Sequence, residues 1–398
     1  MSWPLAKLGD VISFVRGVTF TPEDQVDPFS DGSTVVMRTK NVQVAGLDQS
    51  DLIAVPSGFV RRKEQSLREG DILVSSANSW ELVGKASYVP KLAYEATAGG
   101  FISIVRVKES LIDSRYLYHW VACPATQHKI RHCGRQTTNI SNLDVGRFQN
   151  LEIPLPPLPE QKRIAAILDK ADAIRRKRQQ AIQLADDFLR AVFLDMFGDP
   201  VTNPKGWDTC KFEALTSLVT YGLTVRPQYH EEGIPLISAR EIRTGELDYE
   251  SCPKISRSDF DALSEKGRPK KDDILFSKTG SIGHCAIVKS ELDFAVTQNA
   301  ARIVPNKDIC DPIFLLAFMR TNYFYDLANK EAKGNAVKDL QLGVMKDFPM
   351  YIPPVSLQKK FVDVYSKASL LSVKVSGGSV LLSSNFGALS QAAFSGQL

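Results

Sequence analysis

Histidine and cysteine, the side chains that most often bind zinc, are concentrated in one short stretch of this sequence. Between residues 119 and 133 these residues are His119, Cys123, His128, His132 and Cys133. A zinc site needs about four ligands at spacings that bring them around one ion. The spacing here matches no standard finger, and the first two residues fall in an apolar stretch with a helical pattern. We therefore interpret the cluster as coincidental and expect no metal site.

A carboxylate–carboxylate–lysine pattern, which some nucleases use, is formed by Asp311 with Glu331 and Lys333. So short a pattern often arises by chance, and Gly334 predicts a loop directly after it. The sequence has no G-x-x-x-x-G-K-[S/T] loop for an ATP-driven motor. It also lacks the N/D-P-P-[Y/F] motif with which adenine methyltransferases hold a flipped base. We therefore predict a chain that is not an enzyme, with no catalytic residue and no cofactor.

Polar side chains suited to DNA follow a basic cluster in residues 134–142 (GRQTTNISN), and residues 333–338 (KGNAVK) are their counterpart. Arg, Lys, Gln, Asn and Thr can pair with base edges or phosphates. An ordinary polar loop is the alternative interpretation. The DNA-binding candidates in these two segments and in the preceding basic cluster are Arg131, Arg135, Gln136, Thr137, Asn139, Lys333, Asn335 and Lys338.

Further candidates lie in loops that follow the predicted strands. They are Arg38, Lys40, Asn41, Ser76, Asn78, Arg240, Arg243, Lys278 and Thr279. Residues 175–178 (RRKR) could also touch a DNA backbone across unread base pairs. We favour a solvated helix face for this run, because the opposite face of the same helix is predicted to be buried.

Four segments recur in the same order at an offset of about 200 residues, which indicates two similar modules rather than an array of short repeats. The segments beginning at Trp3 and Trp207 correspond. The other pairs are residues 40–48 (KNVQVAGLD) with 240–248 (REIRTGELD), 69–73 (EGDIL) with 271–275 (KDDIL), and 153–163 (IPLPPLPEQKR) with 350–360 (MYIPPVSLQKK).

Each module has the same internal order. Short β-type runs and a shorter helical stretch predict an α+β domain. A proline-rich hinge follows, and apolar residues then recur in steps of three and four, the pattern of a coiled-coil seam. We expect one helix over residues 159–197, roughly 58 Å long at ~1.5 Å per residue. A second helix, over residues 357–394, is interrupted by Gly377 and Gly378.

The helical region at residues 153–182, FLDMFGDP at 193–200 and AFSGQL at 393–398 together resemble type I restriction-modification specificity subunits. The resemblance covers the whole chain. It implies two target-recognition domains joined by a pair of long antiparallel coiled-coil helices. The expected boundaries are residues 1–152 and 199–349 for the recognition domains, and 153–198 and 350–398 for the helical regions.

This resemblance also implies the function. Each recognition domain would read one half of a bipartite target in double-stranded DNA, and the helices would set the unread spacer. Two modification (methyltransferase) subunits would dock on the helices and methylate adenine with S-adenosylmethionine. ATP-dependent restriction subunits could join them, so all chemistry would belong to partners.

Composition agrees with this hypothesis without requiring it. The net charge is only +4, and no apolar run is long enough for a signal peptide or a membrane span, so we expect a cytoplasmic chain. The six cysteines form no C-x-x-C pair, which favours a reducing compartment. A complete nuclease or methyltransferase, and a coiled-coil assembly protein without DNA affinity, remain the alternatives. Activity of the purified chain and a gel shift at low salt would discriminate between them.

Overall fold

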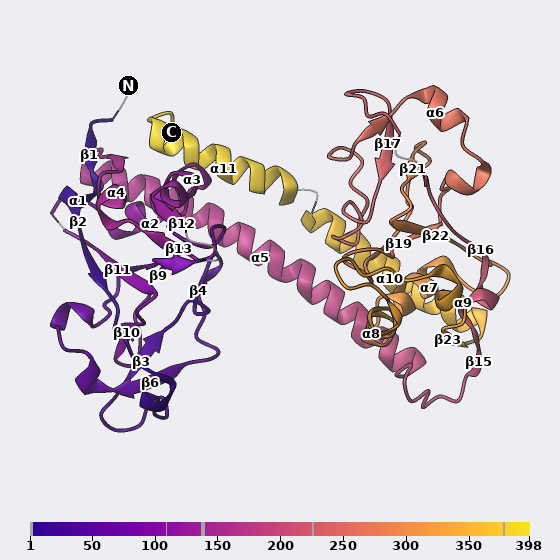
Figure 1. Ribbon diagram of the computed structural model, residues 1–398, viewed down its shortest axis with the longest axis horizontal. Helices are drawn as coiled ribbons and strands as arrows, with labels where there is room; N and C mark the ends of the chain where they lie inside the picture. Colours follow the sequence, from indigo (N-terminus) through magenta and orange to yellow (C-terminus); the bar gives the residue numbers. More distant parts are fainter. Residues whose placement is uncertain (1–2, 109, 137–139, 225–226, 377–378) are drawn as a thin grey trace. The chain divides into compact units, whose positions relative to one another are not determined.

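Helix α5 (Leu158–Phe197) begins in one structural unit of the chain and ends in the other (Figure 1). The computed structural model describes all residues except 1–2, 109, 137–139, 225–226 and 377–378. Unit 1 comprises residues 1–180 and 375–398, and unit 2 comprises residues 181–374. Each unit therefore combines one predicted globular module with a part of α5 and a part of the C-terminal helical region.

Unit 1 is a mixture of short strands and helices. Its strands are β1 (Leu5–Lys7), β2 (Ile12–Arg16), β3 (Ser33–Met37), β4 (Val42–Gln43), β5 (Gly46–Leu47), β6 (Ile53–Pro56), β7 (Ile72–Ser75), β8 (Ala77–Asn78), β9 (Ala86–Tyr88), β10 (Ala96–Ala98), β11 (Ile102–Val107), β12 (Gly134–Gln136), β13 (Ser141–Leu143) and β14 (Glu152–Pro154). Its helices, besides the first part of α5, are α1 (Leu8–Val11), α2 (Ser114–Ala122), α3 (Pro124–His132), α4 (Val145–Gln149) and α11 (Ser379–Ser395).

Unit 2 has the same kind of composition. Its strands are β15 (Asp208–Lys211), β16 (Thr216–Tyr221), β17 (Ile234–Ile237), β18 (Lys254–Ile255), β19 (Ile274–Ser277), β20 (Cys285–Ile287), β21 (Ala295–Val296), β22 (Ala300–Pro305) and β23 (Pro349–Ile352). Its helices, besides the last part of α5, are α6 (Arg257–Asp261), α7 (Pro312–Met319), α8 (Asn322–Glu331), α9 (Leu342–Lys346) and α10 (Val355–Ser376).

The sheets of the two units have one topology. The antiparallel order β2-β11-β7-β9 in unit 1 corresponds to β16-β22-β19-β20 in unit 2. The mixed sheet β10-β3-β6 corresponds to β21-β17-β18, with the parallel pair in the same place. The pairs β1-β14 and β15-β23 bring the two ends of each domain together. The predicted α+β duplication is confirmed.

An ion pair with a buried aspartate, directly before an inner strand of each large sheet, explains why EGDIL and KDDIL recur. Asp71 binds the Arg106 guanidinium through both oxygens at 2.7 Å, and its carboxylate also caps the backbone N–H of Arg68. Asp273 lies 2.6 Å from Arg302 Nε and caps the backbone in the same way. A charge buried in a core needs such a partner, so this position in the repeat tolerates little change.

The hinge glutamine at the start of each long helix makes the same three hydrogen bonds in both units. Gln161 Oε1 accepts from the backbone N–H of Asp113 at 2.8 Å, and its Nε2 donates to the carbonyls of Leu111 and Pro156. Gln358 makes the corresponding bonds in unit 2. Both side chains are buried. One buried amide in each unit therefore fastens the start of the long helix to the domain before it.

Burial along α5 is concentrated where the helix packs against a globular core. Ile164 and Leu168 are buried in the core of unit 1, and Phe193 and Phe197 in the core of unit 2. The prediction that one seam buries the apolar residues of the whole helix is wrong for Ile174 and Phe188, which are exposed. Both lie along α5 between Leu168 and Phe193, outside the stretches of the helix that are buried in the two cores.

Helix α11 runs antiparallel to α5 within unit 1. Arg163 donates to the backbone carbonyl of Leu398 at 3.2 Å, whereas Arg175, three turns later, lies over the Phe386 ring. Phe394 packs edge-on against Tyr116 of α2. The predicted interruption at Gly377 and Gly378 lies outside the described residues. None of the described helices combines the length and the apolar character that a bilayer span requires.

Candidate nucleic-acid interface

The unit 1 candidates around residue 135 lie on a small three-stranded sheet. Arg135 of β12 pairs with Asn142 of β13, and β13 in turn pairs with Ala77 and Asn78 of β8. Gly134 packs closely at the start of this hairpin, because a Cβ there would lie 2.4 Å from Ser141 Oγ and would force that hydroxyl to move. The sequence candidates from two distant segments are therefore brought together. Thr137 and Asn139 lie outside the described residues, and of Gln136 only the strand position is described.

The corresponding loop of unit 2 spans residues 333–339 and is closed at its base. The backbones of Lys333 and Asp339 exchange two hydrogen bonds, of 3.0 and 2.8 Å. Lys278 Nζ lies 2.5 Å from Asp339 Oδ1, and Thr279 Oγ1 donates to the same oxygen. Lys278 and Thr279, which are candidates from a separate loop, therefore lie beside the candidates of the second segment. Their side chains are engaged in holding the loop rather than directed outward.

Other side chains of these two loops are available to a ligand. Lys333, Asn335 and Lys338 are exposed. Arg135 lies 2.6 Å from Asp144, but this ion pair is at the surface and contributes little, so phosphate could replace it. Arg131, in the last turn of α3, is half-buried. Each unit thus presents exposed cationic and amide groups on a backbone anchored at its base.

The candidates in the first loop of each domain are less uniform. The Asn41 side chain is 1% exposed and bonds with the backbone of Arg38, Asp48 and Asp51, so its role is to shape the loop. Its assignment as a DNA contact is corrected for this reason. Arg38 and Lys40 both pair with Asp51 at the surface.

In unit 2, Arg240 is exposed and Arg243 donates to Ser281 Oγ at 2.9 Å. In unit 1, Ser76 and Asn78 are half-buried, and Asn78 donates to Ser75 Oγ at 3.2 Å. The side chains of Arg243 and Asn78 are therefore engaged within their own unit, whereas Arg240 is accessible to solvent.

The basic run at residues 175–178 is partly engaged within unit 1. Arg175 and Arg176 both pair with Asp172, and Arg176 also donates to the carbonyl of Ala45. The interpretation of this run as a structural helix face is therefore favoured over contact with DNA.

A charged cluster joins α2 to α5 at the histidine that the sequence singled out. Buried His119 lies 2.6 Å from Asp169 Oδ1, and Arg115 Nε donates to the same carboxylate at 3.1 Å. Burial opposes ionisation of Asp169, but the hydrogen bonds from His119 and Arg115 outweigh it and lower the carboxyl pKa to about 2. This cluster is structural, because it joins a domain helix to the long helix.

Three more of the residues that resembled metal or nuclease sites, His128, His132 and Asp311, have structural contacts. The rings of His128 and His132 are in tilted contact with centroids 4.4 Å apart, and Trp80 packs edge-on against His132. Asp311 caps the first turn of α7. No group of three or more His, Cys, Asp or Glu within the described residues is placed to hold a metal ion.

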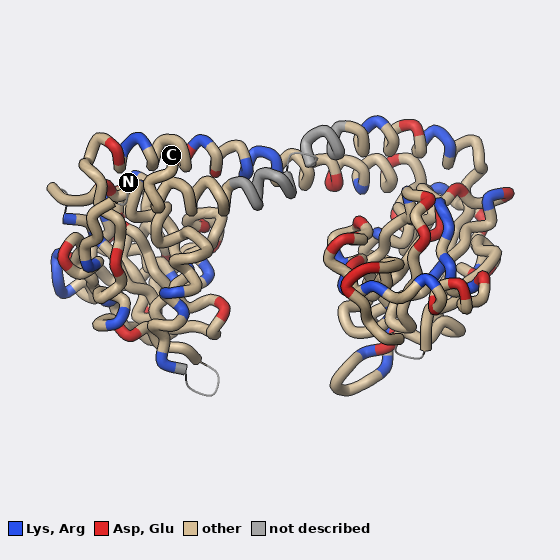
Figure 2. Tube along the Cα trace, turned by 90° about the horizontal axis from the view of Figure 1, so that it is seen from above, with Lys and Arg blue, Asp and Glu red and all other residues tan. Residues whose placement is uncertain are grey.

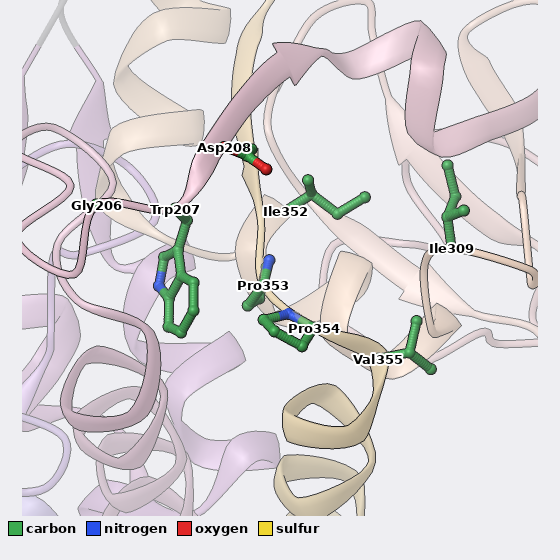
Figure 3. Close-up of a pocket in the computed structure, with 8 residues that line it drawn as sticks. All are labelled: Gly206, Trp207, Asp208, Ile309, Ile352, Pro353, Pro354 and Val355. Atoms are coloured by element: carbon green, nitrogen blue, oxygen red, sulfur yellow. The ribbon is translucent and has the colours of Figure 1, made fainter.

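A pocket of about 380 Å³ lies where α10 begins in unit 2 (Figure 3). Its lining residues are Gly206, Trp207, Asp208, Ile309, Ile352, Pro353, Pro354 and Val355. The lining is apolar except for one carboxylate, so it offers phosphate no cation. The pocket is therefore separate from the candidate interface.

Lys and Arg are interspersed with Asp and Glu over both units, as Figure 2 shows. The candidate interface is therefore defined by individual loops and not by one large basic face. Sequence reasoning missed Asp339 and Asp51, which hold the basic side chains of two loops. The signal for Asp339 was its correspondence with Asn142 of the first repeat. Asn142 pairs with Ala77 in unit 1, as Asp339 pairs with Thr279 in unit 2.

Comparison with protein families decides the assignment. The family model described as the type I restriction modification DNA specificity domain matches residues 2–184 and 226–370. The chain belongs to this family. The two matched segments correspond to the two repeats of the fold, so the family accounts for the duplicated architecture.

Relatives include the specificity subunit of the type I restriction enzyme EcoKI from Escherichia coli, which is 27% identical over 72% of this chain and 64% of its own length. The chain thus aligns with less than two thirds of that relative. The MjaVIII specificity subunit of Methanocaldococcus jannaschii is 21% identical over 94% of this chain and 87% of its own length. The crystal structure of a type I S subunit from M. genitalium has the same fold. It has a TM-score of 0.60 and 13% identity, and the match covers 99% of this chain and 96% of that one.

Proposed function

We propose that this protein is the non-catalytic DNA-recognition subunit of a type I restriction-modification complex. The observation that supports it best is the duplication: each unit of this specificity-family member carries an anchored loop with exposed cationic and amide side chains. Residues 1–152 and 199–349 would each read one half of a bipartite target. The cytoplasm, where such a target would lie, is its proposed location.

The exposed side chains suit the two tasks of DNA recognition. Arg135, Lys333 and Lys338 can contact phosphates, which positions the loops and makes binding depend on salt. Asn335 can pair with an adenine edge in the major groove. Loops anchored at the base bring these groups to DNA with little loss of conformational entropy, which favours discrimination between sequences.

The helical regions, residues 153–198 and 350–398, are proposed to set the unread spacer and to dock modification subunits. The exposed apolar residues Ile174 and Phe188 of α5 support docking, because a partner helix could cover them. ATP-dependent restriction subunits are the proposed further partners. All methyl transfer and cleavage would belong to these subunits.

Selection from a random duplex library tests this function. The purified full chain, alone and co-expressed with its modification subunits, is incubated with the library, and bound DNA is sequenced. We expect two constant blocks separated by a spacer of fixed length and random sequence. No enrichment, or one contiguous block, would contradict the proposal. Transfer of labelled methyl groups by the chain alone would identify it as an enzyme instead.

A further inference from the structure

The loop of residues 333–339 presents an apolar side chain among polar ones. Val337 is 60% exposed, in a segment where Asn335 and Lys338 are also exposed. In unit 1, Ile140 is 47% exposed at the corresponding place. Each lies two residues before the residue that pairs with the strand segment after the large sheet, Asp339 in unit 2 and Asn142 in unit 1.

The backbone at Val337 is held in place by a close approach. Gly334 has a φ of +126°, and a Cβ on it would lie 2.2 Å from the carbonyl oxygen of Val337. The two backbones can therefore touch only because residue 334 is glycine. Gly280 donates to the Lys338 carbonyl at 2.8 Å, and Asp339 is held by Lys278. These contacts hold the backbone from which the Val337 side chain projects.

Val337 does not contribute to the described hydrophobic core of unit 2. A single exposed apolar residue is common on protein surfaces and needs no special explanation by itself. Here, however, both modules place a β-branched apolar residue at the same point of the same loop. Since the two modules share little sequence in these loops, the recurrence indicates that the surface reads an apolar group.

DNA offers one apolar group on its base edges, the C5 methyl group of thymine, which faces the major groove. Insertion of a side chain between base pairs is the other apolar mode, and it generally uses bulkier residues such as Phe, Leu or Met. Valine has a short, stiff side chain that reaches only a group standing out from the base edge. The chemistry of this residue therefore fits the methyl group better than a base step.

We propose that Val337 is a specificity-determining residue that contacts a thymine C5 methyl group in the half-site read by unit 2. This inference rests on the proposed function, since it needs a DNA target. Lys333 and Lys338 would hold the phosphates on either side of the contact. Removing one buried methyl group from the DNA should weaken binding roughly fourfold.

Deoxyuridine substitution tests the contact. The sequence selected by the full chain is synthesised with deoxyuridine in place of thymidine in one half-site at a time. Affinity is then measured for the unaltered chain and for the Val337→Ala and Val201→Ala variants. Val201 is also exposed, at 69%, but lies in the turn after α5, so it is the matched control.

The unaltered chain and the control should lose roughly fourfold in affinity when the half-site read by unit 2 carries deoxyuridine. Val337→Ala should bind thymidine DNA about as weakly as the unaltered chain binds deoxyuridine DNA, and should not distinguish the two. Equal binding of both DNAs by the unaltered chain overturns the proposal, as does discrimination retained by Val337→Ala. A unit 2 half-site without a T·A pair overturns it as well.

Two further results would distinguish failure of the methyl contact from failure of the proposed function. If Val337→Ala weakens binding to both DNAs equally, the side chain acts by insertion and the methyl contact is wrong. If no sequence is selected at all, the proposed function itself fails before deoxyuridine is tested.

Discussion

Gln161 accepts a hydrogen bond from the backbone N–H of Asp113 at 2.8 Å, and this bond fastens the long helix α5 to the domain that precedes it. Gln358 and Asp311 repeat the bond in unit 2. Replacing Gln161 or Gln358 by Ala leaves buried backbone groups without partners. Each change should lower the free energy of unfolding by about 1–3 kcal/mol.

Denaturant unfolding of the two variants measures this loss, and Gln179→Ala, at an exposed position of α5, is the control. A midpoint for Gln161→Ala equal to that of the control would show that the amide does not hold the hinge.

The Asp169 carboxylate gives unit 1 a dependence on acid. Its pKa is about 2 in the folded chain, below the ~3.9 of an unfolded aspartate. Because the folded pKa is the lower one, the stabilisation is fully present above about pH 4 and is lost as the pH falls toward 2. Asp169→Asn should therefore destabilise the chain at pH 7, and the difference from the unaltered chain should shrink below pH 4.

Unfolding of both chains between pH 7 and 2.5 measures this difference. Asp187→Asn, at an exposed position of the same helix, should show no such trend. A difference that stays constant down to pH 2.5 would mean that His119 and Arg115 do not hold the carboxylate ionised.

Salt dependence tests which loop cations meet phosphate. Each phosphate contact that is removed should reduce the slope of log K against log salt by about 1. We expect this for Arg135→Ala and for Lys333→Ala, whereas Lys211→Ala, which loses only a surface pair with Asp347, should leave the slope unchanged. Arg131 is half-buried, so Arg131→Ala distinguishes two roles. A reduced slope would indicate a phosphate contact, and an unchanged slope would indicate a packing role. Slopes identical to that of the unaltered chain for Arg135→Ala and Lys333→Ala would place both residues away from the DNA backbone.

The length of α5 is predicted to set the spacer. Four residues inserted near Ala181 add roughly 6 Å of helix at nearly one full turn, close to the rise of two base pairs. The selected motif should keep both halves and gain a longer spacer. Two inserted residues rotate the later face by about 200° and should disrupt packing instead. A folded four-residue variant with an unchanged spacer would show that α5 does not act as the ruler.

The duplication and the hinge could be predicted because they depend on patterns local in sequence. EGDIL and KDDIL recur since each contains a carboxylate that must meet a buried arginine, Arg106 or Arg302. The hinge glutamines recur because each bonds three backbone groups at the start of a long helix. Helix α5 was also predicted closely, because its proline start and its glycine end are strong local signals.

The roles of individual loop residues could not be predicted, because they depend on partners distant in sequence. Asn41 has the polar character of a DNA contact, and only its bonds to Asp48 and Asp51 show that it shapes a loop. Lysine side chains usually extend into solvent, but Asp339, 61 positions later in the sequence, holds Lys278 by an ion pair. Ile174 and Phe188 fit the helical stripe, but periodicity does not show where a globular core ends.

Exchange of one recognition module tests the central claim most directly. Residues 1–152 are replaced by the corresponding domain of a relative with a known target, and methylated adenines are mapped across the genome of cells carrying the exchanged chain with its modification subunits. The account predicts that one half of the methylated motif changes to that of the relative, while the other half and the spacer stay. A motif altered in both halves, or in neither, would contradict the assignment of one half-site to each unit.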